Sequence, residues 1–205
     1  MTVISNGTNL INNGTLDSGI PTGAMTLIKT LTASSSATLD FLNGTSNVVF
    51  DGTYKEYVFK FYNIHPATNG ADFTFQADTG TNTNYNIAMT TTYIRAAHGE
   101  DDSGDSLTYD TGRDQAEGTG FLQVISGIGN DADGNGNGTL NIFSPSSSTF
   151  VKHFIIRSCT SYEDSIGRDM FIAGYFNTTT ALTRVRFKMS SGNIDSGIIK
   201  MYGIK

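Results

Sequence analysis

The sequence predicts an all-β protein, an antiparallel two-sheet sandwich of the jelly-roll type with an extended N-terminal arm. Short runs of aromatic and β-branched residues alternate with a period of two, as strands with two distinct faces require. Turn-forming residues separate these runs, and the chain has 23 glycines but only 3 prolines. Almost no window shows the apolar spacing of a helix. A closed barrel is the alternative to the sandwich.

The strongest strand signal lies in residues 53–77, where two alternating runs flank a turn. The first run has one face with Tyr57, Phe59 and Phe61 and another with Val58, Lys60, Tyr62 and Ile64. It ends at Pro66, because proline has no N–H to donate to a neighbouring strand. Residues 67–70 have the composition of a turn. We expect this first strand to be well buried.

The second run predicts a strand with one wet face. Its inward residues are expected to be Phe73, Phe75 and Ala77, and its solvent-facing residues Asp72, Thr74 and Gln76. Apolar and polar residues alternate in this way when an antiparallel sheet has one face on the core and one in water.

The other strands are predicted, in chain order, at residues 25–30, 37–42, 48–50, 86–95, 121–125, 140–143, 150–159, 170–176, 184–189 and 197–204. Phe154, Ile155 and Ile156 are contiguous, as is typical of a strand at the centre of a sheet. Polar loops are expected at 98–120 and 127–138. In the first loop, Leu107 and Tyr109 are expected as anchors and 114–117 as one helical turn. Many short strands with no helix between them favour the sandwich.

Composition limits the partners that we expect. The net charge of −6 opposes nonspecific binding to nucleic acid, which needs a dense cationic face. No apolar run approaches the ~20 residues that a membrane-spanning helix needs. Cys159 is the one cysteine, so no intrachain disulfide forms, and its place in an apolar strand predicts an inert buried thiol. No secretory signal opens the sequence, so we expect a soluble protein made in a cytoplasm, with no nucleic-acid or membrane partner.

Residues 1–24 differ from the rest, because they carry a single charge, Asp17, and are rich in Asn, Gly, Thr and Ser. Their isolated apolar residues cannot bury enough surface alone to offset the entropy lost on ordering. We therefore expect a polar docking arm at 1–24, ordered against a partner, and a β-sandwich domain at 25–205. A mobile N-terminus is the alternative.

A calcium turn is a candidate at Asp131, Asp133 and Asn135. Oxygen ligands at alternate positions, with Gly136 at the sixth, are typical of an EF-hand loop. Ile142 occupies the twelfth position, where a bidentate glutamate is required, so a solvated glycine-rich turn is the alternative.

Other chemistry has weaker signals. The carboxylates at 100–102 and Asp105 are a second candidate for a divalent cation, with solvated loop carboxylates as the alternative. His65, His98 and His153 lack the paired spacing of a transition-metal site. The sequence contains neither a Gly-x-Ser-x-Gly nucleophile motif nor a phosphate-binding loop. We therefore expect no enzymatic activity and no other cofactor.

Five long phrases carry a family likeness: IPTGAMTLIKTLTASSSATLDF (20–41), TYKEYVFKFYNIHPATNGADFTFQ (53–76), FSPSSSTFVKHF (143–154), AGYFNTTTALTRVRFKMSSGNIDSG (173–197) and IIKMYGIK (198–205). They resemble small virion structural proteins of tailed bacteriophages, many of them from marine and cyanobacterial hosts. The likeness runs from Leu10 to the C-terminus. It implies a scaffold, and it transfers no catalytic or binding residues to this chain.

The resemblance implies a non-enzymatic protein on the exterior of a virion, assembled in the host cytoplasm. It would be a capsid decoration (cement) subunit or a tail-associated subunit, attached through residues 1–24 to other virion proteins. Particle proteins of this kind are often trimeric, so we expect a homotrimer. The alternative is a receptor- or glycan-binding fibre-tip module that binds a host-surface glycan through the loops 98–120 and 127–138. A fibre tip usually follows a long shaft, whereas this chain has only a short arm.

Overall fold

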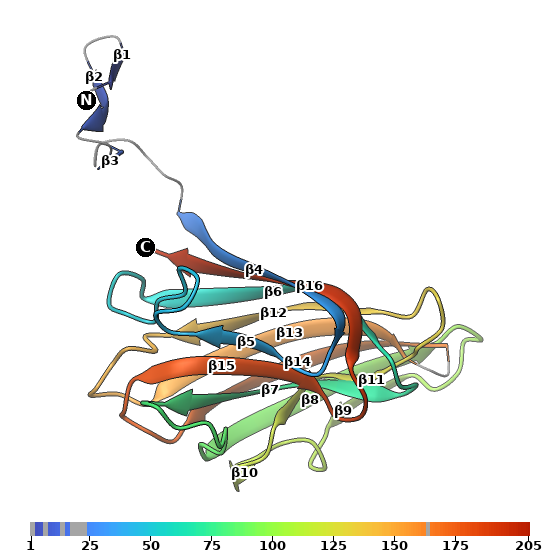
Figure 1. Ribbon diagram of the computed structural model, residues 1–205. Coiled ribbons are helices and arrows are strands. Elements are labelled where there is room, and N and C mark those ends of the chain that lie inside the picture. Colours follow the sequence, from blue (N-terminus) through green and yellow to red (C-terminus); the bar gives the residue numbers. More distant parts are fainter. Residues whose placement is uncertain (1–2, 6–7, 13–14, 17–23, 163–164) are drawn as a thin grey trace.

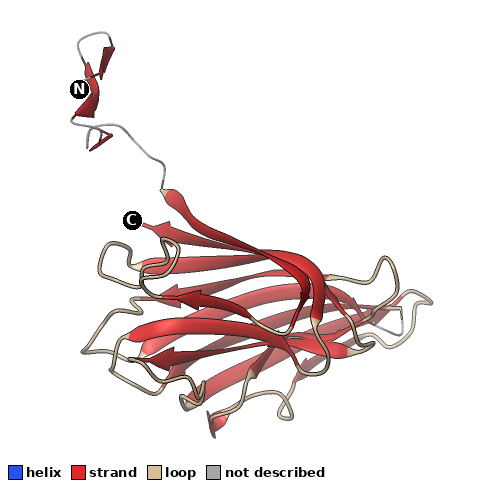
Figure 2. Cartoon of the chain, in the orientation of Figure 1, coloured by secondary structure: helices blue, strands red, loops and turns tan. Residues whose placement is uncertain are grey.

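The computed structural model describes residues 3–5, 8–12, 15–16, 24–162 and 165–205. These residues contain strands, turns and irregular segments and no helix (Figure 2). Two antiparallel sheets are present, one of 3 strands and one of 13 strands (Figure 1). The prediction of an all-β, antiparallel fold is confirmed.

The small sheet consists of β1 (Val3–Ser5), β2 (Thr8–Asn12) and β3 (Thr15–Leu16). The large sheet consists of β4 (Met25–Ser36), β5 (Leu39–Leu42), β6 (Glu56–Pro66), β7 (Ala71–Thr79), β8 (Met89–Gly99), β9 (Ser106–Tyr109), β10 (Ala116–Gly118), β11 (Leu122–Ile128), β12 (Gly136–Phe143), β13 (Lys152–Tyr162), β14 (Ile166–Phe176), β15 (Leu182–Met189) and β16 (Ile194–Ile204).

Eight strands of the large sheet form a two-layer jelly roll. One layer has the order β4-β16-β6-β12, and the other has the order β5-β15-β7-β11. Along the chain, successive strands pass mostly from one layer to the other, which is the connectivity of a jelly roll. The layers join where β11 pairs with β13 through Ile128 and Tyr162. This join makes the whole sheet nearly closed and barrel-like (Figure 1).

Two insertions widen the first layer beyond β12. Strands β13 and β14 are inserted between β12 and β15, and β8, β9 and β10 are inserted between β7 and β11. They add to the sheet in the order β12-β13-β14-β8, and β9 and β10 pair with β8. The β13–β14 and β14–β8 pairs are in register over the full length of β14. The jelly roll therefore carries a lateral extension of its larger layer.

Phenylalanine rings fill the space between the two layers. Phe187 of β15 is fully buried, and its ring centroid lies 5.6 Å from that of Phe59 and 5.3 Å from that of Phe61, both in the opposite layer. Its other ring contacts are with Phe41, Phe73 and Phe75. Such edge-on and offset ring pairs stabilise a fold by about 0.5–1.5 kcal/mol each beyond the burial of their surface.

Strand β6 follows its prediction until Asn63. Tyr57, Phe59 and Phe61 point into the core as expected. The prediction that Ile64 shares the face of Val58 is wrong, because Ile64 is fully buried in the core. Asn63 has a φ of 49°, and the pairing with β12 and β16 shifts register around it. This β-bulge returns the next side chain to the core face.

The prediction of a wet face on β7 is wrong. Phe73, Phe75 and Ala77 point inward as expected, but Thr74 and Gln76 are buried too. The Gln76 side chain donates from Nε2 to the carbonyl oxygens of Ile87 (3.1 Å), Thr119 (3.3 Å) and Gly120 (3.0 Å). The segments that flank the β8–β10 insertion therefore cover this side of β7 and satisfy its polar side chains.

Three local predictions are corrected by the structure. Val48 and Phe50 are buried, but residues 48–50 are not a strand. Residues 114–117 form no helical turn, since 116–118 is strand β10. Residues 98–120 contain β9, and its Leu107 and Tyr109 are exposed rather than anchored in the core.

The domain boundary predicted at residue 25 coincides with the first residue of β4. Among the described residues, the strands of the small sheet pair only with one another. The remaining residues of the predicted arm, at 1–2, 6–7, 13–14 and 17–23, lie outside the described residues. The docking role of the arm stays a prediction.

We predict that Phe187→Ala lowers the free energy of unfolding by about 3–5 kcal/mol, because it leaves a cavity among the rings of both layers. The control is Phe150→Ala, since the side chain of Phe150 is 71% exposed. The control should change the stability by less than about 0.5 kcal/mol. Urea denaturation measures both values, and equal losses for the two variants would contradict the placement of Phe187.

Candidate functional site

The extension of the larger layer has one face on the core and one face in solvent. Along β13, every second residue is buried, from Lys152 to Thr160, and the residues between them are exposed. Pairing places the exposed residues of β13, β14 and β8 in rows, such as Arg157 beside Phe171 and Phe171 beside Ile94. Tyr109 of β9 continues this row. We call the solvent-facing side chains of β8, β9, β13 and β14 the outer face.

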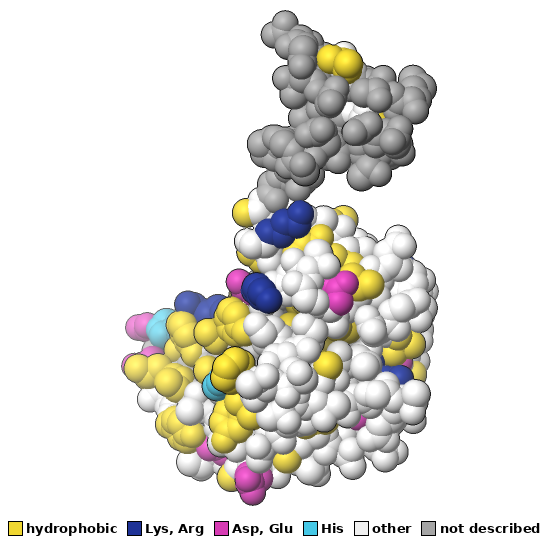
Figure 3. All heavy atoms as spheres, turned by 90° about the vertical axis from the view of Figure 1, so that its left-hand side faces the viewer, with side chains coloured by type: hydrophobic (Ala, Val, Ile, Leu, Met, Phe, Trp, Pro, Cys, Tyr) yellow, Lys and Arg dark blue, Asp and Glu magenta, His cyan; other side chains and the backbone are white. Residues whose placement is uncertain are grey.

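The outer face is rich in exposed apolar side chains. Its members include Ile155 (52% exposed), Phe171 (42%) and Leu107 (78%), together with Ile94 and Tyr109. Figure 3 shows hydrophobic side chains gathered on one side of the molecule, toward the left of the view. The prediction that Ile155 is buried at a sheet centre is wrong, because only the inner face of β13 packs on the core. Contiguous exposed apolar surface of this kind is typical of an interaction site.

The charged pair of the outer face is internally neutralised. Arg157 donates to both carboxylate oxygens of Asp169, from Nε at 2.8 Å and from Nη2 at 2.5 Å. The Arg157 guanidinium also lies 3.7 Å from the ring centroid of Phe171. The hydrogen bond to Asp169 raises the pKa of Arg157. The ion pair fixes the guanidinium over the ring, so this part of the outer face has no net charge.

Small residues leave hollows between the large ones. An apolar hollow of about 390 Å³ lies beside Ile155 and is lined by His153, Ala173 and Tyr175, among others. The rings of His153 and Tyr175 lie 5.7 Å apart and form one wall. The outer face is therefore corrugated rather than smooth.

A more polar hollow of about 550 Å³ lies at the other end of the outer face. It is lined by His98, Asn135, Asn137, Cys159 and Asp169, among others. His98 belongs to the predicted loop 98–120 and the two asparagines to 127–138, so the structure brings these distant segments together. The prediction that Cys159 is a buried core thiol is wrong, because Cys159 is exposed. It stands on the outer face, since strand β13 alternates at this end as well.

The candidate calcium turn is held by its own hydrogen bonds. Asn135 Nδ2 donates to the Asp133 carbonyl oxygen (3.0 Å), and Asn137 Nδ2 donates to Asn135 Oδ1 (2.6 Å). Asp131 and Asp133 are exposed. Across the described ranges, no group of three or more His, Cys, Asp or Glu is placed to hold a metal ion. Calcium at Asp131, Asp133 and Asn135 stays a prediction.

The other predicted polar residues take local partners. Asp101 accepts hydrogen bonds from the backbone and hydroxyl of Ser103, and the hydroxyl bond is the larger cause of its lowered pKa. His98 Nε2 lies 3.4 Å from Asp102 Oδ1. His65 has a different partner, because its Nδ1 atom lies 2.6 Å from the carbonyl oxygen of Gly134. The contacts of Asp101 and His98 close turns, the contact of His65 ties β6 to the turn that contains Gly134, and none of them joins the histidines into one site.

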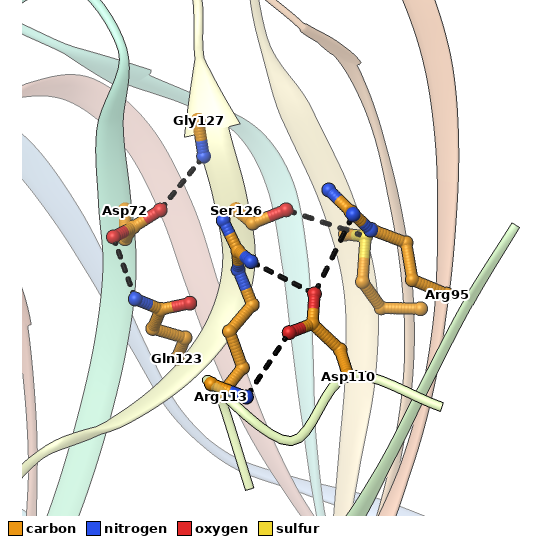
Figure 4. Close-up of polar contacts among 9 residues, drawn as sticks. Asp72, Arg95, Asp110, Arg113, Gln123, Ser126 and Gly127 are labelled. Carbon is orange, nitrogen blue, oxygen red and sulfur yellow. Dashed lines mark hydrogen bonds and ion pairs between the residues drawn. The ribbon is translucent and has the colours of Figure 1, made fainter. Parts of the chain in front are cut away.

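Two sets of polar contacts brace this region of the fold, one within the β8–β10 insertion and the other between β7 and β11. Asp110 lies between Arg113, whose Nη1 is 2.8 Å from Asp110 Oδ2, and Arg95, whose Nη2 is 3.5 Å from the same oxygen (Figure 4). Asp72 accepts from the backbone N–H of Gly127 (2.9 Å) and from Gln123 Nε2 (2.8 Å). These partly buried contacts fix the segment after β9 against β8, and β11 against β7.

A buried lysine stands where β13 begins. Lys152 is fully buried, and its Nζ donates to the carbonyl oxygens of Phe150 (3.0 Å) and Thr178 (3.2 Å). Burial lowers the pKa of Lys152, because it disfavours the charged form of the amine.

Sequence reasoning missed the outer face. The signal was present in the strand 150–159, because a strand places Ile155 opposite to Phe154 and Ile156. A contiguous apolar run predicts a strand that is buried on both faces. A strand with one buried face and one exposed apolar face gives the same run, so the sequence does not distinguish these two kinds of strand.

Comparison with known proteins found no matching family model, no similar curated protein and no similar solved structure. Among the described residues, no helix has the length and hydropathy needed to cross a membrane. We therefore infer the function from the geometry of this chain and from the resemblance in its sequence.

We predict that burial of Lys152 makes stability rise with pH in the alkaline range. The folded state releases the Lys152 proton below the ordinary value of 10.5, whereas the unfolded state releases it near that value. Between the two pKa values the unfolded state binds more protons, so the free energy of unfolding increases as pH rises. Urea titrations at neutral and alkaline pH should show this increase in the wild type relative to Lys152→Met. A constant difference between the two proteins at all pH values would contradict it.

Proposed function

We propose that this chain is a non-enzymatic structural subunit on the exterior of a tailed-bacteriophage particle, as a capsid decoration (cement) subunit or a tail-associated subunit. The observation that carries the proposal is the outer face of β8, β9, β13 and β14. Its exposed apolar side chains, such as Ile155 and Phe171, are not needed to fill the core. Solvent-exposed apolar surface without a role in folding is typical of a subunit that makes contacts in an assembly.

The jelly-roll body supports the same proposal. Its layers are interlocked by buried rings around Phe187. Asp110 holds the segment after β9 to Arg95 of β8, and Asp72 ties β7 to β11. A rigid body of this kind presents a contact surface at a fixed geometry, which lowers the entropy lost on association. The long phrases that resemble phage virion proteins point to the same class of protein.

In this proposal, residues 1–24 attach the subunit to other virion proteins. The jelly-roll body begins with β4 at Met25, and the described part of the small sheet pairs with none of its strands. Attachment and folding are therefore separable, because they use different parts of the chain.

We predict that a chain lacking residues 1–24 folds but fails to enter particles. Its cooperative thermal unfolding should match that of the full chain, because no strand pair of the large sheet is lost. Particles grown with each form are purified, and the bound chain is quantified by mass spectrometry. A truncated chain that enters particles as well as the full chain would show that the attachment site lies elsewhere.

A receptor- or glycan-binding function is the second candidate. The observation in its favour is the polar hollow that His98 shares with Asn135 and Asn137. Hollows with amide and imidazole groups at their rim are suited to hydroxyl-rich ligands, because these groups donate and accept hydrogen bonds.

The glycan function predicts adsorption of the purified protein to host cells. Asn137→Ala should reduce that adsorption if the hollow is the binding site, whereas an exposed residue away from it, such as Phe150→Ala, should not. Adsorption that is absent from the wild type would reject this second function and leave the structural role in place.

A further inference from the structure

We propose that the outer face is covered by a second copy of this chain. The inference rests on the proposed function only in treating the chain as a subunit of an assembly. It names the surface by which subunits meet one another, in addition to the attachment of residues 1–24 to other virion proteins. Two copies that meet through the same face form a dimer, so this contact differs from the homotrimer that the resemblance implies.

Charge is the first argument for a second copy. The chain has a net charge of −6, so two copies repel one another over most orientations. On the outer face, however, Arg157 and Asp169 neutralise each other within one chain. The other carboxylates, at 100–102 and Asp105, are exposed in the loop beyond the ends of β8 and β9, and Asp102 among them faces His98. Two such faces can meet without burying an unpaired charge, whereas an acidic or basic partner would gain no complementary charge there.

Area is the second argument. The strands β8, β13 and β14 have 11 residues each. At ~3.3 Å per residue and ~4.8 Å per strand, these three strands span ~36 Å by ~14 Å, and the 4 residues of β9 add ~60 Å². The projected area is ~580 Å² per copy, so two copies would bury ~1,160 Å², above the ~1,000 Å² expected of a specific interface. The face is therefore large enough for a specific contact between copies.

Shape is the third argument. Large and small residues alternate along the strands: Phe171 and Ala173 are neighbours on this face of β14, and Ile94 and Ala96 on this face of β8. Ile155 of β13 pairs with the small Ala173. Beside Ile155 lies the hollow of about 390 Å³. When sheets pack face to face, side chains of one sheet enter the spaces of the other. A corrugated face has both the protrusions and the hollows that its own copy requires.

The test compares two matched variants of the purified full chain. Ile155→Lys places a charge on the outer face, and Leu27→Lys places the same charge on β4. Both side chains are 52% exposed, so each lysine can reach solvent and neither should unfold the protein. Circular dichroism and thermal unfolding check that the fold is retained. Sedimentation velocity then gives the mass of each protein over a range of concentrations.

We expect the wild type and Leu27→Lys to associate, and Ile155→Lys to weaken association by at least about tenfold, because its lysine is desolvated without a partner. The native Cys159 gives a second readout, since it stands on the outer face. Maleimide should label Cys159 slowly in the associated wild type and in Leu27→Lys, and rapidly in Ile155→Lys.

A wild type that remains monomeric at every concentration, with Cys159 fully reactive, would overturn the inference. So would association that Ile155→Lys and Leu27→Lys affect equally, because the copies would then meet through another surface. If the wild type is monomeric but Ile155→Lys alone fails to enter particles, the face binds a different virion protein and the inference is wrong. In each of these outcomes, particle entry of the full chain still tests the proposed function by itself.

Discussion

Phenylalanine rings packed between the two layers of the jelly roll hold the whole fold together. Phe187 contacts rings from its own layer and from the opposite layer, so neither layer can shift without breaking ring contacts. The chain needs no disulfide to hold the layers together. Because these rings fill the jelly roll, β13 and β14 can widen one layer and still find an apolar surface for their inner side chains, such as Phe154, which contacts Phe75.

This packing explains why the outer face is available for contacts. A strand places alternate side chains on opposite faces, and the core takes only one set from β13 and β14. The other set carries Ile155 and Phe171, whose exposure costs the isolated subunit hydrophobic free energy. Exposed apolar residues at these positions are the basis of the proposed interaction. The partly buried contact of Asp110 with Arg95 holds the segment after β9 against β8, which is one of the strands of the outer face.

Much of the fold could be predicted from the sequence, because strand periodicity and turn composition are local signals. The inward face of Tyr57, Phe59 and Phe61 and the end of the strand at Pro66 follow from such signals. Ile64 could not be placed, because the bulge at Asn63 depends on pairing with β12 and β16. Gln76 could not be placed either, because its burial depends on carbonyl groups far along the chain. The outer face and the exposure of Cys159 depend on which strands cover which layer, and only the assembled topology determines this.

We propose that the apolar side chains of the outer face serve assembly rather than folding. Hydroxyl-radical footprinting of the associated protein distinguishes these two roles, because footprinting measures the solvent access of individual side chains. If the outer face is covered in the assembly, Ile155 and Phe171 are protected there and oxidised in the dissociated chain, whereas Leu27 and Phe150 are oxidised in both states. Equal oxidation of Ile155 and Phe171 in the two states would show that the outer face stays open to solvent.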